Sequence, residues 1–101
     1  MHDETLTLEQ IEQAVCQTAR EHDVQRVYLF GSHARGDATK TSDIDLCLET
    51  GPSFSLFDAG DFSLNIELLL GAPVDLVTER TLYPHVREEM LKDRVLMYEH
   101  S

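Results

Sequence analysis

The sequence predicts an α/β (α+β) layered domain with about four strands and flanking helices. Apolar residues at helical spacing alternate along the chain with short runs of β-branched and aromatic residues. The 101 residues suffice for one domain with one hydrophobic core, and the 42% hydrophobic and 27% charged composition is that of a globular protein. We therefore expect residues 1–101 to form a single small domain.

The first helix is expected from Thr7 to about Glu21. Thr7 can cap its N-terminus, and Gln10 stands three residues later as the partner of a capping box. Apolar residues recur at steps of three and four and therefore share one face, namely Leu8, Ile11, Val15 and Ala19.

Two strands and a polar connection follow this helix. Val24–Phe30 is apolar and β-branched, and Gly31 ends it. The connection 31–42 is polar, and its start is compatible with a short helical turn. Asp43–Glu49 is the second expected strand, with one apolar face (Ile44, Leu46, Leu48) and the other formed by Asp43, Asp45 and Cys47.

The second half of the chain continues the alternation. A helix is expected from Ser55 to about Leu70, with Gly71 as its stop. A strand is expected at Val74–Thr78, a helix from Pro84 to about Lys92, and a last strand at Arg94–Tyr98. The aromatic residues around the long helix are predicted to serve the core or an interface, namely Phe54, Phe57 and Phe62.

The charge balance is strongly acidic. Eight Lys and Arg stand against 19 Asp and Glu, which gives a net charge of −11. Nucleic acids and anionic membranes repel such a surface, so we expect neither as a direct partner, whereas a basic protein would be attracted. Cys16 and Cys47 form no metal-binding or redox motif, and a reduced, cytoplasmic protein is the expectation.

The tripeptide Asp43-Ile44-Asp45 is the strongest chemical signal. Residues two apart on a strand project from the same face, so both carboxylates can converge on one hard cation. Aspartate is depleted in strands and like charges repel, so a divalent metal would offset both costs. Taken alone, the tripeptide is also common on solvated edge strands.

Two further features accompany this tripeptide. Gly31-Ser32 follows the first strand directly, where exposed amides and a hydroxyl can bind phosphate, although a plain strand-ending turn has the same sequence. Asp75 interrupts the apolar run of the third strand, either as a third converging carboxylate or as an exposed or salt-bridged strand residue. Three carboxylates would suit a two-metal site.

Together these residues resemble the nucleotidyltransferase superfamily of the DNA polymerase β type. Gly31-Ser32-His33-Ala34-Arg35-Gly36 and Ser42-Asp43-Ile44-Asp45-Leu46 are similar to the motifs of its minimal nucleotidyltransferase (MNT) branch, and the likeness covers nearly the whole chain. The resemblance implies the nucleotidyltransferase fold, with a mixed sheet of about four strands and flanking helices.

The resemblance also implies roles for individual residues. Asp43, Asp45 and Asp75 match the family's catalytic, metal-binding carboxylates, which would hold two Mg²⁺ ions, with ATP as the substrate. Gly31 and Ser32 would hold the distal phosphates, and Ser42 would also bind the nucleotide. Arg35 and Lys40 are the nearest cations for the triphosphate, or plain surface charges, and His33 is expected to be an ordinary loop histidine.

MNT proteins typically act as antitoxins in type VII-like toxin–antitoxin modules with HEPN ribonucleases. The resemblance therefore implies a Mg²⁺-dependent protein adenylyltransferase that moves AMP from ATP to a tyrosine hydroxyl of a HEPN toxin. The alternative is a non-catalytic antitoxin that neutralises the HEPN toxin by stoichiometric binding. Tyr83 and Tyr98 could accept AMP in a self-modification, but nothing in the sequence favours it.

Overall fold

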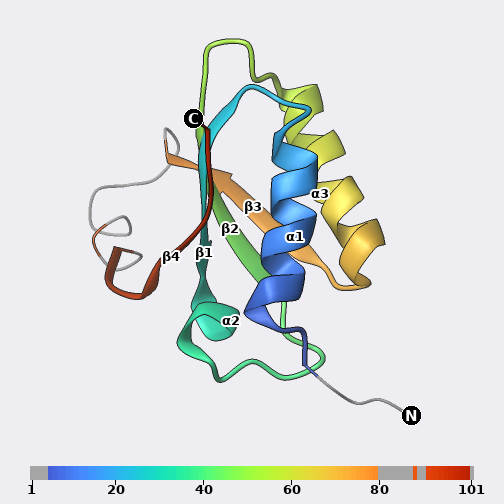
Figure 1. Cartoon of the computed structure of the whole chain (residues 1–101), viewed down its shortest axis with the longest axis vertical. Coiled ribbons are helices and arrows are strands. Elements are labelled where there is room, and N and C mark those ends of the chain that lie inside the picture. The colour runs from blue at the N-terminus through green and yellow to red at the C-terminus, as the bar shows by residue number, and fades with distance from the viewer. Residues whose placement is uncertain (1–4, 80–87, 89–90, 101) are drawn as a thin grey trace.

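A four-stranded sheet with two long helices on one face forms the framework of the protein (Figure 1). The computed structural model describes residues 5–79, 88 and 91–100. The elements are α1 (Leu8–Ala19), β1 (Val24–Phe30), α2 (Gly31–Arg35), β2 (Ile44–Thr50), α3 (Leu56–Leu70), β3 (Val74–Thr78) and β4 (Val95–Glu99).

Both long helices begin with a capping box. In α1, the Thr7 hydroxyl accepts from the Gln10 amide while the Gln10 side chain accepts from the Thr7 amide, as the sequence predicts. Ser55 and Asp58 form the same reciprocal pair at α3. Gly71 ends α3 with φ +69°, a left-handed conformation that glycine adopts without steric cost.

The strands lie in the order β3-β2-β1-β4, with β1 and β2 in the centre. β1 pairs antiparallel with both β2 and β4, while β2 pairs in parallel with β3. Parallel pairing needs a long crossover, and α3 supplies it between β2 and β3. The mixed sheet that the sequence predicts is confirmed.

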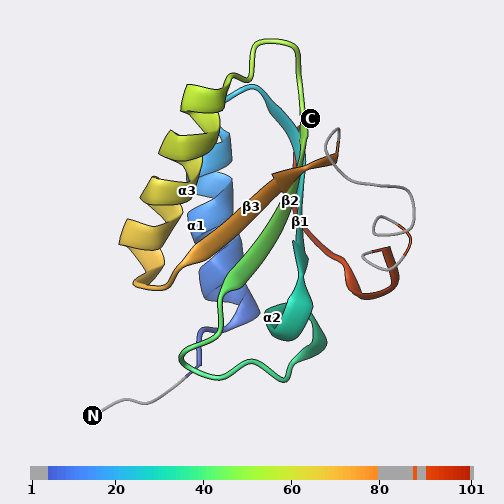
Figure 2. The same ribbon diagram turned by 180° about the vertical axis from the view of Figure 1, so that it is seen from behind.

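The hydrophobic core lies between the sheet and the two long helices, and both views place α1 and α3 on the same side (Figures 1 and 2). Because side chains alternate along a strand, the apolar residues of β2 point to this core and Asp45 lies on the opposite face. The largest fully buried side chains are Ile11, Leu29, Ile44, Leu46, Leu48, Phe62 and Ile66.

Several element ends differ from the prediction by one or two residues. β2 begins at Ile44, so Asp43 precedes the strand, and β4 is Val95–Glu99. α1 ends at Ala19 because the chain must turn before β1. The helix predicted from Pro84 to Lys92 falls largely outside the described residues.

The prediction for His33 as a loop histidine is wrong. His33 lies in the short helix α2 and is buried, because α2 folds against the ends of β1 and β2. In residues 5–79, 88 and 91–100, none of the helices has the length and apolar character needed to cross a bilayer.

Candidate active site

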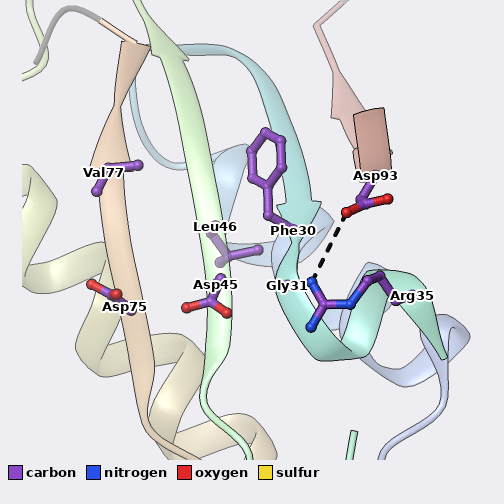
Figure 3. Close-up of a pocket in the computed structure, with 8 residues that line it drawn as sticks. All are labelled: Phe30, Gly31, Arg35, Asp45, Leu46, Asp75, Val77 and Asp93. Carbon is purple, nitrogen blue, oxygen red and sulfur yellow. Dashed lines mark ion pairs between the residues drawn. The ribbon is translucent and has the colours of Figure 1, made fainter. Parts of the chain in front are cut away.

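A pocket of about 350 Å³ opens on the sheet face opposite the two long helices. This volume is in the usual range for small-molecule sites. Figure 3 shows its lining side chains, with the helical layer behind the sheet. The residues that line the pocket are Phe30, Gly31, Arg35, Asp45, Leu46, Asp75, Val77 and Asp93.

Asp45 and Asp75 lie side by side in this pocket (Figure 3). They are direct partners in the parallel register of β2 and β3, although 30 positions separate them in the chain. Parallel register places both side chains on the same face of the sheet, one strand spacing apart. The sheet therefore brings together two of the three carboxylates that the sequence singles out.

The Asp45 carboxylate lies in an unfavourable environment for a negative charge. Burial raises the pKa of Asp45 above its ordinary value, and the carboxylates of Asp75 and Asp43 raise it further. His33 and Arg35 act in the opposite direction. Among the described residues, no side chain or amide donates a hydrogen bond to this carboxylate, so its charge is compensated only through space, by His33 and Arg35.

Gly31 makes the close approach between α2 and Asp45 possible. Its φ is +72°, and a Cβ atom built at this position would collide with Oδ2 of Asp45. Only glycine satisfies both constraints without strain. The sequence signal of a glycine directly after a strand is thus explained by the proximity of the Asp45 carboxylate.

The other predicted site residues lie around this pair. Arg35 lines the pocket and forms ion pairs with Asp37 (3.4 Å) and Asp93 (3.9 Å). Ser32 is in the first turn of α2, and its hydroxyl has no hydrogen-bond partner among the described residues. Asp43 is exposed just before β2, outside the pocket lining but within electrostatic range of Asp45.

Lys40 and Ser42 line a different, smaller pocket. Its volume is about 140 Å³, and its lining includes Thr39 and the buried His33 but none of the residues that line the Asp45 pocket. The Ser42 hydroxyl accepts a hydrogen bond from the Thr39 amide, which stabilises the loop before β2. The nucleotide contact predicted for Lys40 and Ser42 stays a prediction.

Sequence reasoning missed Asp93, Phe30 and Val77 in the pocket lining. Phe30 and Val77 carry a weak signal, since each occupies the same strand face as a predicted carboxylate. Asp93 carries none, because its place near Arg35 depends on tertiary packing between residues far apart in the sequence.

The carboxylate pair suits a hard cation, since carboxylate oxygens are the ligands that Mg²⁺ prefers. Within the part of the chain that the structure describes, no three His, Cys, Asp or Glu side chains form a group that could hold a metal ion by themselves. Mg²⁺ is commonly bound through one or two carboxylates together with substrate phosphates. The pair therefore fits a cation that arrives with a phosphorylated substrate.

Known proteins resemble this chain in both sequence and fold. The protein adenylyltransferase MntA of Thermococcus cleftensis is 32% identical over 94 residues, which cover 89% of this chain and 95% of that protein. MJ0435 of Methanocaldococcus jannaschii, whose name proposes protein adenylyltransferase activity, is 34% identical over 91 residues, or 90% of this chain and 92% of that protein.

Solved structures agree with this likeness. A proposed minimal nucleotidyltransferase has a TM-score of 0.79 at 38% identity and covers 89% of this chain and 95% of its own. A toxin–antitoxin crystal structure with AMP-PNP has a TM-score of 0.76 at 21% identity, with 89% and 74% covered. A complex of tri-AMPylated Shewanella oneidensis HEPN toxin with MNT antitoxin has a TM-score of 0.71 at 18% identity, with 93% and 74% covered.

The last two likenesses are of fold alone, whereas the first three extend to sequence. Residues 8–97 also match the nucleotidyltransferase domain family. With a paired-carboxylate pocket beside a glycine-opened turn and relatives above 30% identity over about nine-tenths of its length, this chain belongs to the nucleotidyltransferase domain family.

Proposed function

We propose that this chain is a cytoplasmic antitoxin of a HEPN/MNT toxin–antitoxin module and acts as a protein adenylyltransferase. It transfers AMP from ATP to a tyrosine hydroxyl of a HEPN ribonuclease toxin, and residues 1–101 form a single minimal domain. The observation that carries the proposal is the register pairing of Asp45 with Asp75 beside Gly31 in one pocket. The relatives named as protein adenylyltransferases support the reaction class.

The residues of α2 would bind the phosphates of the nucleotide. Gly31 lets the backbone approach closely, and the Ser32 hydroxyl, which none of the described residues engages, can donate to a phosphate oxygen. Arg35 would exchange its two exposed carboxylate partners for the triphosphate, because a guanidinium forms strong paired hydrogen bonds with phosphate.

Asp43, Asp45 and Asp75 would hold Mg²⁺, which when bound neutralises the triphosphate and polarises the α-phosphate. The raised pKa of Asp45 supports this role, because a carboxylate that is poorly compensated in the free protein gains most from a cation. Mg²⁺ and ATP would therefore bind together rather than separately.

Asp75 is placed to help remove the proton of the attacking tyrosine hydroxyl. It is exposed on the edge strand β3, where an acceptor from a second protein can reach it. The acceptor oxygen forms a bond to the α-phosphorus, the bond between the α-phosphorus and the bridging oxygen breaks, and diphosphate leaves. Positioning and charge neutralisation dominate such transfers.

Mass spectrometry of the partner after incubation tests the proposal. Incubation of the purified chain with ATP, Mg²⁺ and the product of the adjacent gene, which the proposal takes to be the HEPN toxin, should give a gain of about 329 Da per transferred AMP, which the double variant Asp43→Ala with Asp45→Ala abolishes. Neutralisation of the toxin by that variant without a mass change would instead support stoichiometric masking.

A further inference from the structure

The helix α3 carries two apolar stripes on opposite sides. Its inner stripe, with Phe62 and Ile66, is fully buried against the sheet. At 100° per residue, Phe57, Leu64 and Leu68 fall on the other side of the helix. They are 90%, 53% and 73% exposed. These three residues are the outer stripe of α3.

An exposed apolar stripe of this kind indicates a surface that binds another molecule. A helix with apolar residues on two opposite sides usually packs on both, and monomeric proteins rarely expose contiguous apolar patches larger than a few hundred Å². Figures 1 and 2 show α3 as the outermost element of the helical side, with no described segment of the chain over it. The exposed apolar surface is therefore available to another molecule.

The charge of the helical side indicates what kind of molecule can bind to the stripe. The helical side carries five carboxylates, with Glu9 and Glu12 on α1 and Asp58, Asp61 and Glu67 on α3, whereas α1 and α3 contain no Lys or Arg. A second copy docked through this face would bring two acidic surfaces together, because a two-fold contact joins like to like. A partner with a basic rim is instead attracted.

We propose that the outer stripe of α3 is the docking surface for the basic protein that this chain modifies. This inference rests on the proposed function for the identity of the partner, the HEPN toxin. Phe57 is the aromatic anchor at the N-terminal end of the stripe, Leu64 and Leu68 extend the apolar contact along the helix, and the exposed Asp61 beside them can receive a Lys or Arg side chain of the toxin.

The docking surface and the pocket lie on opposite faces of the molecule. Asp45 and Asp75 open onto the sheet face away from the helices (Figure 3). The outer stripe lies on the side of α3 opposite the buried Phe62 and Ile66, and so faces away from the sheet. A toxin molecule held on α3 and a tyrosine in the pocket therefore occupy different surfaces. Stable complex formation and AMP transfer are separable functions of this chain.

Binding and transfer should be measured with the HEPN protein encoded beside this chain. Phe57→Ser and Leu68→Lys should each weaken its binding by about tenfold or more, as loss of an interface anchor does. The kcat of AMP transfer should stay within about twofold of the unaltered chain while KM for the toxin rises. Retained kcat also shows that the variants fold.

Two controls sharpen the result. Leu8→Lys introduces the same charge at a half-exposed leucine of α1 and should leave binding unchanged. Leu68→Glu should weaken binding less than Leu68→Lys, because a basic partner accepts an added carboxylate better than an added ammonium. Weaker binding by Leu68→Glu than by Leu68→Lys would contradict the inference that the partner is basic.

Three other outcomes overturn the inference in distinguishable ways. Normal AMP transfer together with unchanged binding by Phe57→Ser and Leu68→Lys would refute the docking surface and leave the proposed function standing. A dimer of the chain alone that Phe57→Ser dissociates in analytical ultracentrifugation would assign the stripe to a second copy. An unaltered chain that neither binds nor modifies the HEPN protein would refute both proposals.

Discussion

Asp45 and Asp58 are aspartates in opposite situations. Two hydrogen bonds from Ser55, followed by the contact with His22, lower the pKa of Asp58, whereas burial and neighbouring carboxylates raise that of Asp45. Asp58 caps α3 and lies 3.1 Å from Nδ1 of the buried His22, so its charge is used within the fold. In the described part of the chain the Asp45 carboxylate has no hydrogen-bond donor, which is typical of a group whose partner comes from outside the chain.

A carboxylate with hydrogen-bond partners, such as Asp58, stabilises the protein, whereas one without them, such as Asp45, is available for a ligand. Replacing each aspartate by asparagine should therefore separate effects on stability from effects on activity.

Asp45→Asn should reduce AMP transfer by about a thousandfold or more, because on the proposed function it removes a charged ligand of the Mg²⁺ that arrives with the nucleotide. Asp58→Asn is the matched control and should leave kcat per folded molecule nearly unchanged. Steady-state transfer assays at saturating Mg²⁺ measure both. Equal losses in the two variants would erase the distinction between the two aspartates.

Gly31→Ala should lower activity by about a hundredfold and also destabilise the fold, because the added Cβ strains a positive φ and displaces the Asp45 carboxylate. Gly60→Ala is its control, since a Cβ at Gly60 meets no atom within 4 Å. In the helix interior this alanine should stabilise by about 0.5–1 kcal/mol. Thermal melts and transfer assays report the two effects, and a fully active Gly31→Ala variant would contradict the site.

His22→Ala should lower the free energy of unfolding by about 2 kcal/mol and the Tm by about 10 °C. The His22 side chain is 7% exposed, contacts the rings of Phe54 and Phe62, and has its Nε2 atom 3.0 Å from Asp61 in an ion-pair contact. Its loss leaves a cavity and removes the His22 contact of Asp58, which keeps its hydrogen bonds from Ser55. Replacing the exposed His100 by alanine should change the Tm little. An equally small change for His22→Ala would show that the contacts of His22 do not contribute to stability.

The effect of Asp58→Ala on stability should depend on pH. Because its folded pKa lies below the unfolded value, the stabilisation is complete above the unfolded pKa and disappears as pH falls through the folded pKa. The variant should therefore melt a few degrees below the unaltered chain at pH 7 and should approach it at acid pH. A constant difference in Tm across this range would refute the electrostatic part of the explanation.

Asp45→Asn should have the smallest effect on stability, and in the opposite direction. Its folded pKa lies above the unfolded value, so the ionised carboxylate destabilises the protein increasingly as pH rises through that window and throughout neutral pH. Without Mg²⁺ the variant should melt slightly above the unaltered chain at pH 7 and alike at acid pH. A lower Tm at pH 7 would mean that Asp45 already has a partner within the fold.

Helices and strands could be predicted from local patterns. The Thr7 cap, the apolar face of α1 and the alternation in β2 depend on neighbours within a few residues, so the chain specifies them directly. The carboxylates and the glycine of the site were also visible in the sequence. Element ends were less certain, and Asp43 fell outside its predicted strand because β2 pairs only from Ile44 onward.

Spatial relations required the folded chain. Asp75 meets Asp45 because α3 returns the chain in parallel to β2 in one register, and a shift of one residue would turn Asp75 to the helical face. Three further relations belong to the folded chain. Asp93 forms an ion pair with Arg35, and His33 is buried. A separate pocket is lined by Lys40 and Ser42. Local composition sets which residues form an element, whereas these contacts depend on how distant elements pack, and no local pattern encodes that packing.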